Sequence, residues 1–199
     1  GWSYDASTTF FTRDDLIEKF DLARVSHNPA AFDREKLLWM NGHYIREGSD
    51  DRVAKLLEEM ARADGLSVDP TLVARAVPVV KERMHTIREG VEYLRFLFMD
   101  DVRPDEKAVK FLGDDRAEYL REVASRLEGL DEWRHDEIER VLRALQEEHE
   151  LSSKQAFMPV RAAITGRVVT PPLFESVELL GRTRTLNRIR RAAGVMVED

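Results

Sequence analysis

The chain contains no cysteine among its 199 residues. This absence excludes disulfides, thiol catalysis and thiolate metal sites, and it fits a cytoplasmic protein. Glycine and proline are also scarce, with 10 and 7 residues, which argues against a collagen-like or low-complexity chain. No apolar run approaches the roughly 18 residues that a membrane-spanning helix needs. The sequence therefore predicts a soluble, cytoplasmic protein with no membrane partner.

Several catalytic motifs are missing as well. The five histidines form no HExxH motif and no closely spaced metal-ligand pair, and the chain has neither a GxxxxGK[ST] phosphate loop nor a GxGxxG fingerprint. His135, Asp136 and Glu137 are adjacent on an acidic stretch, which we interpret as a solvated helix face. The other carboxylates fall at exposed helical positions, where paired catalytic acids cannot be told from surface charge. The sequence thus predicts no catalytic residue and no metal site.

Charge is unevenly distributed along the chain. The formal net charge is −7, yet residues 154–199 hold eight Lys and Arg against four Asp and Glu, a net +4. A basic end on an acidic body fits an RNA-binding face of limited area. A solvated Arg-rich terminal helix explains the same pattern, so charge alone leaves both interpretations open.

Helical signals recur along the whole chain. Val53, Leu56, Leu57 and Met60, for example, have the spacing of an apolar helix face. Predicted N-terminal caps are Thr12, Asp33, Asp50, Asp69, Thr86 and Ser152 or Ser153. Predicted helix ends are Gly65, Gly166, Gly181 and Gly194.

No segment alternates as a half-buried strand does, so the predicted fold class is all-α. Pro78 is expected to break or kink its helix. One long helix is expected over 131–150 and another from 170 to 181. Signals for the ends and starts of helices near 48–49 and 100–101 divide the chain into consecutive small modules, 1–48, 49–100 and 101–199. We interpret the aromatics as core packing rather than base-stacking platforms (Phe96, Phe98, Trp133 and Phe157).

Three distinctive strings together span nearly the whole chain. The first is GWS at 1–3, FDLARVSHNPAAFD at 20–33 and KLLWMN at 36–41. The second is VP at 77–78 with KERMHTI at 81–87, and the third is FMPVRAAITG at 157–166, TPPLFE at 170–175 and LG at 180–181. In this order they resemble parts of bacterial glutamyl-tRNA synthetases. These parts are the stem-contacting segment after the catalytic domain, the first helical anticodon-binding module and the C-terminal module.

The resemblance implies an anticodon-binding helical bundle or cage within an aminoacyl-tRNA synthetase, a ligase of protein biosynthesis. The parent enzyme would join glutamate to tRNA with ATP and magnesium. This chain lacks the family's His-Ile-Gly-His-like and Lys-Met-Ser-Lys-Ser-like strings, so we expect a piece that starts after that loop, with no cofactor of its own. The implied partner is glutamate tRNA, with glutamine tRNA left open and no DNA. We expect a monomer.

The resemblance also implies roles for single residues. It places Arg83 at the third anticodon base, which is C in glutamate tRNAs and G in glutamine tRNAs. Four further residues would line the pocket for the other two bases (Arg161, Thr170, Pro171 and Leu173). Lys36 and Asn41 would belong to the stem-contacting segment, and Trp39 is expected in the core.

Other interpretations stay open at this point. Arg83 could be a surface residue paired with Glu82 or Glu89, and Arg161 could belong to a buried ion pair. The whole chain could be a helical protein–protein interaction scaffold, or the tRNA-binding tail of another tRNA enzyme, such as an amidotransferase subunit. A scaffold should show an apolar groove. In an anticodon reader, Arg83, Arg161 and the terminal arginines should converge.

Overall fold

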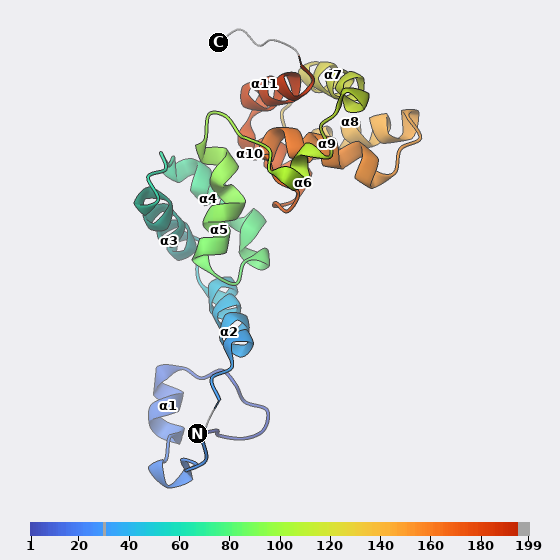
Figure 1. The fold of residues 1–199 in the computed structure, drawn as a ribbon. Helices are drawn as coiled ribbons and strands as arrows, with labels where there is room; N and C mark the ends of the chain where they lie inside the picture. The colour runs from blue at the N-terminus through green and yellow to red at the C-terminus, as the bar shows by residue number, and fades with distance from the viewer. Residues whose placement is uncertain (30, 195–199) are drawn as a thin grey trace. The chain divides into compact units, whose positions relative to one another are not determined.

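The structure is a computed structural model, and it describes residues 1–29 and 31–194. All its regular elements are helical in that part of the chain, which confirms the all-α prediction. The chain divides into two compact units, Gly1–Leu37 and Leu38–Asp199 (Figure 1). Ala30 of the first string and positions 195–199 of the third predicted module lie outside the described residues.

The N-terminal unit is built around an aromatic cluster. The Trp2 ring lies 5.8 Å from the ring of Phe11 and 5.5 Å from that of Phe20. The helix α1 (Arg13–Lys19) is capped by Thr12, as predicted, in a capping box with Asp15. A short 3-10 turn, η1 (Leu22–Arg24), follows. The GWS string therefore supplies the ring on which this unit packs.

Helix α2 (Arg34–Glu47) begins at the predicted cap, because the Asp33 carboxylate accepts a hydrogen bond of 2.9 Å from the Lys36 N–H. Trp39 was expected in the core, and this is wrong: 48% of its surface is exposed. The side of α2 that is buried carries Gly42 and Ile45 instead.

Helices α3 (Asp50–Ala63), α4 (Pro70–Val80) and α5 (Ile87–Leu94) pack against one another as a first bundle. The 3-10 turns η2 (Lys81–Arg83) and η3 (Arg95–Phe98) extend α4 and α5. Ser49, not Asp50, caps α3. The predicted break at Pro78 is also wrong, because α4 runs through it to Val80. The missing proline N–H removes one hydrogen bond, and the helix continues past it.

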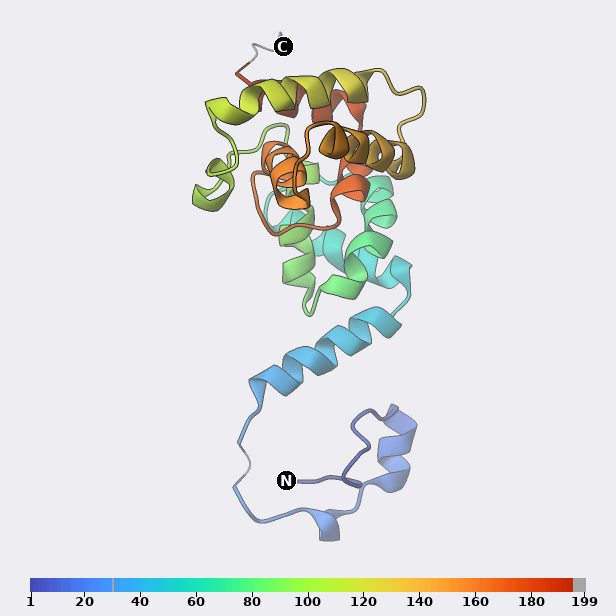
Figure 2. The ribbon, with the colours of Figure 1, turned by 90° about the vertical axis from the view of Figure 1, so that its right-hand side faces the viewer.

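A second bundle contains α6 (Glu106–Val109), α7 (Asp114–Glu128), α8 (His135–Glu148), α9 (Ser153–Thr165), α10 (Leu173–Leu180) and α11 (Arg182–Ala192). Helix α11 lies along α7 (Figure 2) and also contacts α9. The helix predicted from 131 starts only at His135, because Arg134 is extended. The helix predicted from 170 starts at Leu173, since a residue before proline avoids helical backbone angles.

The two bundles share one apolar core, which runs from Ile45 to Ala193. Phe96 is buried within it, and the other three aromatics pack against it, so the packing interpretation is confirmed (Phe98, Trp133 and Phe157). Helix α10 contacts α4 across the junction. The module boundaries at 48–49 and 100–101 stay predictions.

Gly166 fixes how α9 meets the linker between the bundles. Its φ is +69°, a conformation that side chains disfavour. A Cβ atom at Gly166 would lie 2.8 Å from the carbonyl oxygen of Arg103. The Asp105 N–H donates to the Gly166 carbonyl at 3.0 Å. Only glycine fits this close approach without displacing the linker.

Candidate functional site

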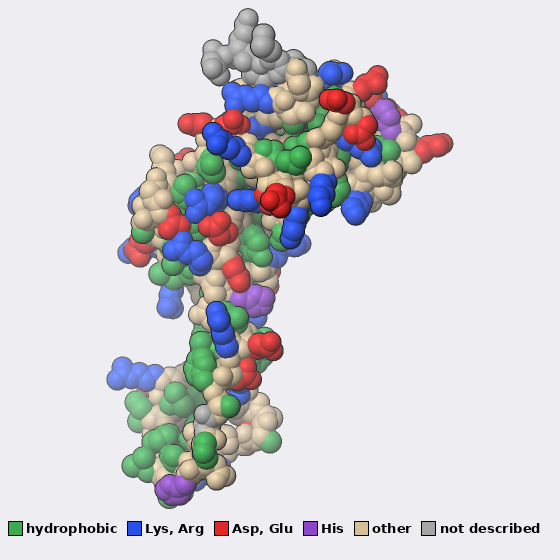
Figure 3. Space-filling view, viewed as in Figure 1, with side chains coloured by type: hydrophobic (Ala, Val, Ile, Leu, Met, Phe, Trp, Pro, Cys, Tyr) green, Lys and Arg blue, Asp and Glu red, His purple; other side chains and the backbone are tan. Residues whose placement is uncertain are grey.

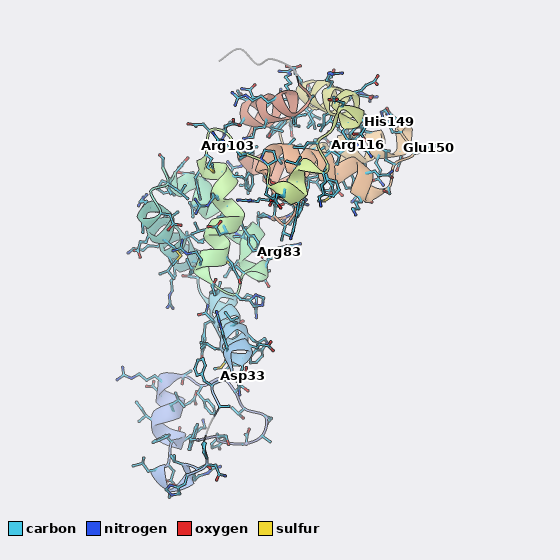
Figure 4. The ribbon with its side chains drawn as sticks, in the orientation of Figure 1. Asp33, Arg83, Arg103, Arg116, His149 and Glu150 are labelled. Carbon is cyan, nitrogen blue, oxygen red and sulfur yellow. The ribbon has the colours of Figure 1, made fainter. Side chains whose placement is uncertain are left out.

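Arg83 lies on the turn η2, between α4 and α5, with its side chain exposed (Figure 4). Among the described residues, no ion pair joins it to Glu82 or Glu89. The Glu89 carboxylate instead accepts hydrogen bonds from the N–H groups of His85, at 2.7 Å, and Thr86, at 3.3 Å. The ion-paired interpretation of Arg83 is therefore not what the structure holds, and its guanidinium is available to a ligand.

The turn that carries Arg83 is held on both sides. The Lys81 ammonium donates to the Gly48 carbonyl at 2.6 Å and to the Asp50 carboxylate at 2.8 Å. The Asn41 side-chain amide donates to the His85 carbonyl. Met84 is fully buried between these anchors. The fixed turn limits the backbone entropy that Arg83 would lose on binding.

Arg161 lies on α9, and its guanidinium holds the segment that leads into α10. One nitrogen, Nη1, donates to the Thr170 hydroxyl and to the Pro171 carbonyl, the latter at 2.7 Å. One turn later, the Thr165 hydroxyl donates to the Arg161 carbonyl at 2.7 Å. The predicted alternative of a buried ion pair is wrong, because these partners are carbonyl and hydroxyl oxygens.

Electrostatics link Arg161 to Arg83. Burial lowers the pKa of Arg161, and the positive charge of Arg83 lowers that pKa further, while Glu175 opposes the shift. One Glu175 carboxylate oxygen is buried with no hydrogen-bond partner in the described part of the chain. The two guanidinium groups therefore repel each other, and the Glu175 charge offsets only part of the shift. A ligand that offers acceptor oxygens or nitrogens would relieve this repulsion.

The other predicted pocket residues contribute mainly through the backbone. The Leu173 side chain is 5% exposed, and Pro171 is also buried. Leu173 is the first residue of α10, and no side chain caps that helix. The first N–H groups of α10 therefore remain available as donors at its positive end. Arg83, Arg161, Thr170, Pro171 and Leu173 are together called the candidate site below.

The arginines of α11 do not join the candidate site. Arg184 donates to the Leu97 carbonyl at 2.7 Å, and buried Arg188 donates to the carbonyls of Phe96 and Met99. Arg190 pairs with Glu128 at 2.6 Å. The expectation that the terminal arginines converge on Arg83 is wrong. The count of charged residues could not predict these contacts, because it cannot tell a solvated arginine from one that binds backbone carbonyls.

The stem-contact residues have different surroundings. Lys36 is exposed on α2, and Asn41 uses its amide to hold His85. Sequence reasoning missed Lys81 and Asn41 as residues that position Arg83, although both lie within the quoted strings. Their contacts join segments that are distant in sequence.

Residues 1–29 and 31–194 contain neither a candidate metal site nor a candidate membrane-spanning helix. No group of three or more His, Cys, Asp or Glu side chains there could hold a metal ion. No helix in this part is long and apolar enough to span a membrane. The donors of the candidate site belong to arginines, a threonine hydroxyl and backbone N–H groups.

Comparisons with known proteins identify the family of this chain. The glutamate–tRNA ligase of Saccharopolyspora erythraea is 38% identical over 203 aligned positions, which cover 98% of this chain and 40% of that protein. That of Acidothermus cellulolyticus is 41% identical, with 98% and 41% covered. This chain thus spans about two fifths of the length of the curated relatives it matches.

A crystal structure of a glutamate tRNA ligase from Elizabethkingia meningosepticum, in complex with its amino acid, has the same fold. The TM-score is 0.85 at 24% identity, over 98% of this chain and 39% of the other. A family model described as "Anticodon binding domain" matches residues 52–193, which include four helices that build the candidate site (α4, α5, α9 and α10). This chain belongs to the anticodon-binding-domain family.

Proposed function

We propose that this chain is the tRNA-binding part of a glutamate–tRNA ligase, and that the candidate site reads the anticodon of glutamate tRNA. The observation that supports the proposal is the pair of guanidinium groups, Arg83 and Arg161: the charge of Arg83 lowers the pKa of Arg161, and Arg83 is exposed with no ion pair among the described residues. RNA supplies what such a pair lacks, namely phosphate oxygens and unpaired base edges in an unstacked loop.

Arg83 is proposed to sense the third anticodon base. Its guanidinium fork presents donors only. The pairing edge of C offers two neighbouring acceptors, O2 and N3, whereas that edge of G offers one acceptor beside two donors. An unpaired Arg83 guanidinium on a fixed turn should therefore bind C more tightly than G, and this base separates glutamate from glutamine tRNAs.

The segment 170–173 is proposed to receive the other two bases. Arg161 fixes its shape through Thr170 and Pro171. The Leu173 N–H at the start of α10 then faces a ligand as a helix N-terminal donor. Arg161 contributes both as a positioning residue and through its remaining N–H groups.

The proposal extends to the rest of the parent protein. Lys36 and Asn41 would support the tRNA stem. ATP and magnesium would serve the catalytic part, which lies outside this sequence. The parent would act as a cytoplasmic monomer on glutamate tRNA, without DNA as a partner.

A binding experiment tests the role of Arg83. The 199-residue chain is titrated with two anticodon stem-loops that differ only in C or G at the third anticodon base. A good bidentate contact between Arg and a base gives roughly 1–3 kcal/mol of discrimination, or about 5- to 150-fold. Arg83→Ala should remove most of the preference for C.

Arg62→Ala is the matched control. Arg62 is an exposed arginine of the first bundle whose ion pair, to Glu58, is local to α3. It should leave the C-to-G ratio unchanged. Equal weakening of both RNAs by Arg83→Ala would make Arg83 a phosphate contact. Failure of the unsubstituted chain to bind either RNA would favour a protein–protein scaffold.

A further inference from the structure

A cavity adjoins the candidate site. Its volume is about 370 Å³. It is lined by the end of α5, by η3 and the linker that follows it, and by the segment that follows α9. Tyr93, Phe96 and Val102 supply apolar walls, and Arg103 and Arg167 supply charge. Its size is at the small end of ligand pockets, which suits one flat group rather than a large ligand.

The carboxylates that line this cavity are already neutralised. Arg95 binds both oxygens of Glu92, at 2.9 and 3.3 Å. Arg191 pairs with Asp101 at 3.1 Å. Arg103, in contrast, is exposed and has no side-chain hydrogen bond or ion pair to any described residue (Figure 4). The cavity therefore combines an apolar floor with an uncommitted positive charge.

The wall beside the linker is rigid. Arg188 donates to the Phe96 carbonyl at 2.9 Å and to the Met99 carbonyl at 2.5 Å. Gly166 packs directly against the backbone of Arg103 on the other side. Tyr93 lines the cavity, is partly buried and packs on the core. These contacts hold the segments that line the cavity in place.

Thr170 connects this cavity to the candidate site. It lines the cavity, and its hydroxyl is also held by Arg161. Lys and Arg side chains, interspersed with acidic ones, gather where the two bundles adjoin (Figure 3). A chain of nucleotides that occupies the candidate site would therefore lead directly to the cavity.

We infer that the cavity binds one unstacked base that lies outside the anticodon. This base belongs to the nucleotide next to the anticodon in the same RNA loop. The base face lies against the Tyr93 ring, and Arg103 meets the phosphate. An aromatic ring accepts any base face, so this contact adds affinity without reading sequence. The inference rests on the proposed function, because the candidate site must hold the anticodon.

A thermodynamic cycle tests the inference. The 199-residue chain and its Tyr93→Leu variant are titrated with an intact anticodon stem-loop. Both are also titrated with two stem-loops that each lack the base on one side of the anticodon. Loss of a base that stacks on an aromatic ring weakens binding roughly 5- to 150-fold. One of the two abasic RNAs should show this loss with the unsubstituted chain and little loss with Tyr93→Leu.

Tyr93→Phe keeps the ring and should keep the sensitivity to the missing base. It separates stacking from any general effect of substitution at this position. If the losses from Tyr93→Leu and from the abasic RNA simply multiply, or if neither abasic RNA binds more weakly, the inference is overturned. Failure of the proposed function looks different, because the unsubstituted chain would then not bind the intact stem-loop at all.

Discussion

Arg188→Met should strongly destabilise the fold. The Arg188 side chain is 3% exposed. Its guanidinium donates to the carbonyls of Phe96, Met99 and Ile164, which lie in the first bundle, the linker and α9. Burial lowers the pKa of Arg188 to about 10, so the group is still charged at neutral pH. Methionine fills a similar volume but leaves three carbonyls without this donor.

The size of the effect follows from those carbonyls. A buried acceptor that loses its partner costs about 1–3 kcal/mol. Three such groups would set an upper limit near 9 kcal/mol, which relaxation and entering water reduce. Removing a buried charge also removes its desolvation cost. We therefore expect a net loss of about 3–5 kcal/mol in the free energy of unfolding, a large share of the ~5–15 kcal/mol typical of a folded domain.

Urea denaturation measures this loss. For m-values of about 2–3 kcal/mol/M, the midpoint should fall by roughly 1–2.5 M. Arg190→Met is the control on the same helix, because Arg190 forms a partly exposed pair with Glu128 and should cost less than about 1 kcal/mol. Equal midpoints for the two variants, or a more stable Arg188→Met, would refute the reasoning that these carbonyls depend on the guanidinium.

Two further predictions concern the junction and the RNA. Gly166→Ala should cost about 1–3 kcal/mol more than Gly65→Ala in denaturation, because both glycines have positive φ but only Gly166 has backbone within reach of a new Cβ. Similar costs would mean that the linker moves aside freely. Binding of the stem-loop should weaken with added salt, with a log–log slope of about −0.7 for each phosphate contacted. A flat salt response would exclude phosphate contacts by Arg103 and its neighbours.

Local signals in the sequence predicted much of the fold. The predicted caps Thr12 and Thr86 both form, and Ser152 rather than Ser153 caps α9, since each cap needs only residues three positions apart. The left-handed glycines at 65 and 166 lie where the helix ends were expected. Several of the errors lie at boundaries, such as the start of α8 at His135 and the cap of α3 at Ser49. There, several neighbouring polar residues could serve as cap, and packing decides among them.

The candidate site was predictable only in part. The quoted strings contain Arg83, Arg161 and the segment 170–173, so the residue types came from the sequence. Their partners did not, because the contacts that anchor the turn carrying Arg83 join segments far apart in the chain. The anchor from Asn41 to His85 spans 44 positions, and the one from Lys81 to Gly48 spans 33. No periodicity or composition encodes such pairings.

The two arginines of the candidate site show why side-chain partners matter for function. From sequence they had the same interpretation, a guanidinium that contacts a base. In the structure, one guanidinium nitrogen of Arg161 donates hydrogen bonds to Thr170 and Pro171, whereas Arg83 has no ion pair among the described residues. A guanidinium that shapes a binding segment influences every base that the segment meets, while a free one can discriminate a single base. Selectivity at the third base should therefore depend on Arg83, and the shape of the whole pocket on Arg161.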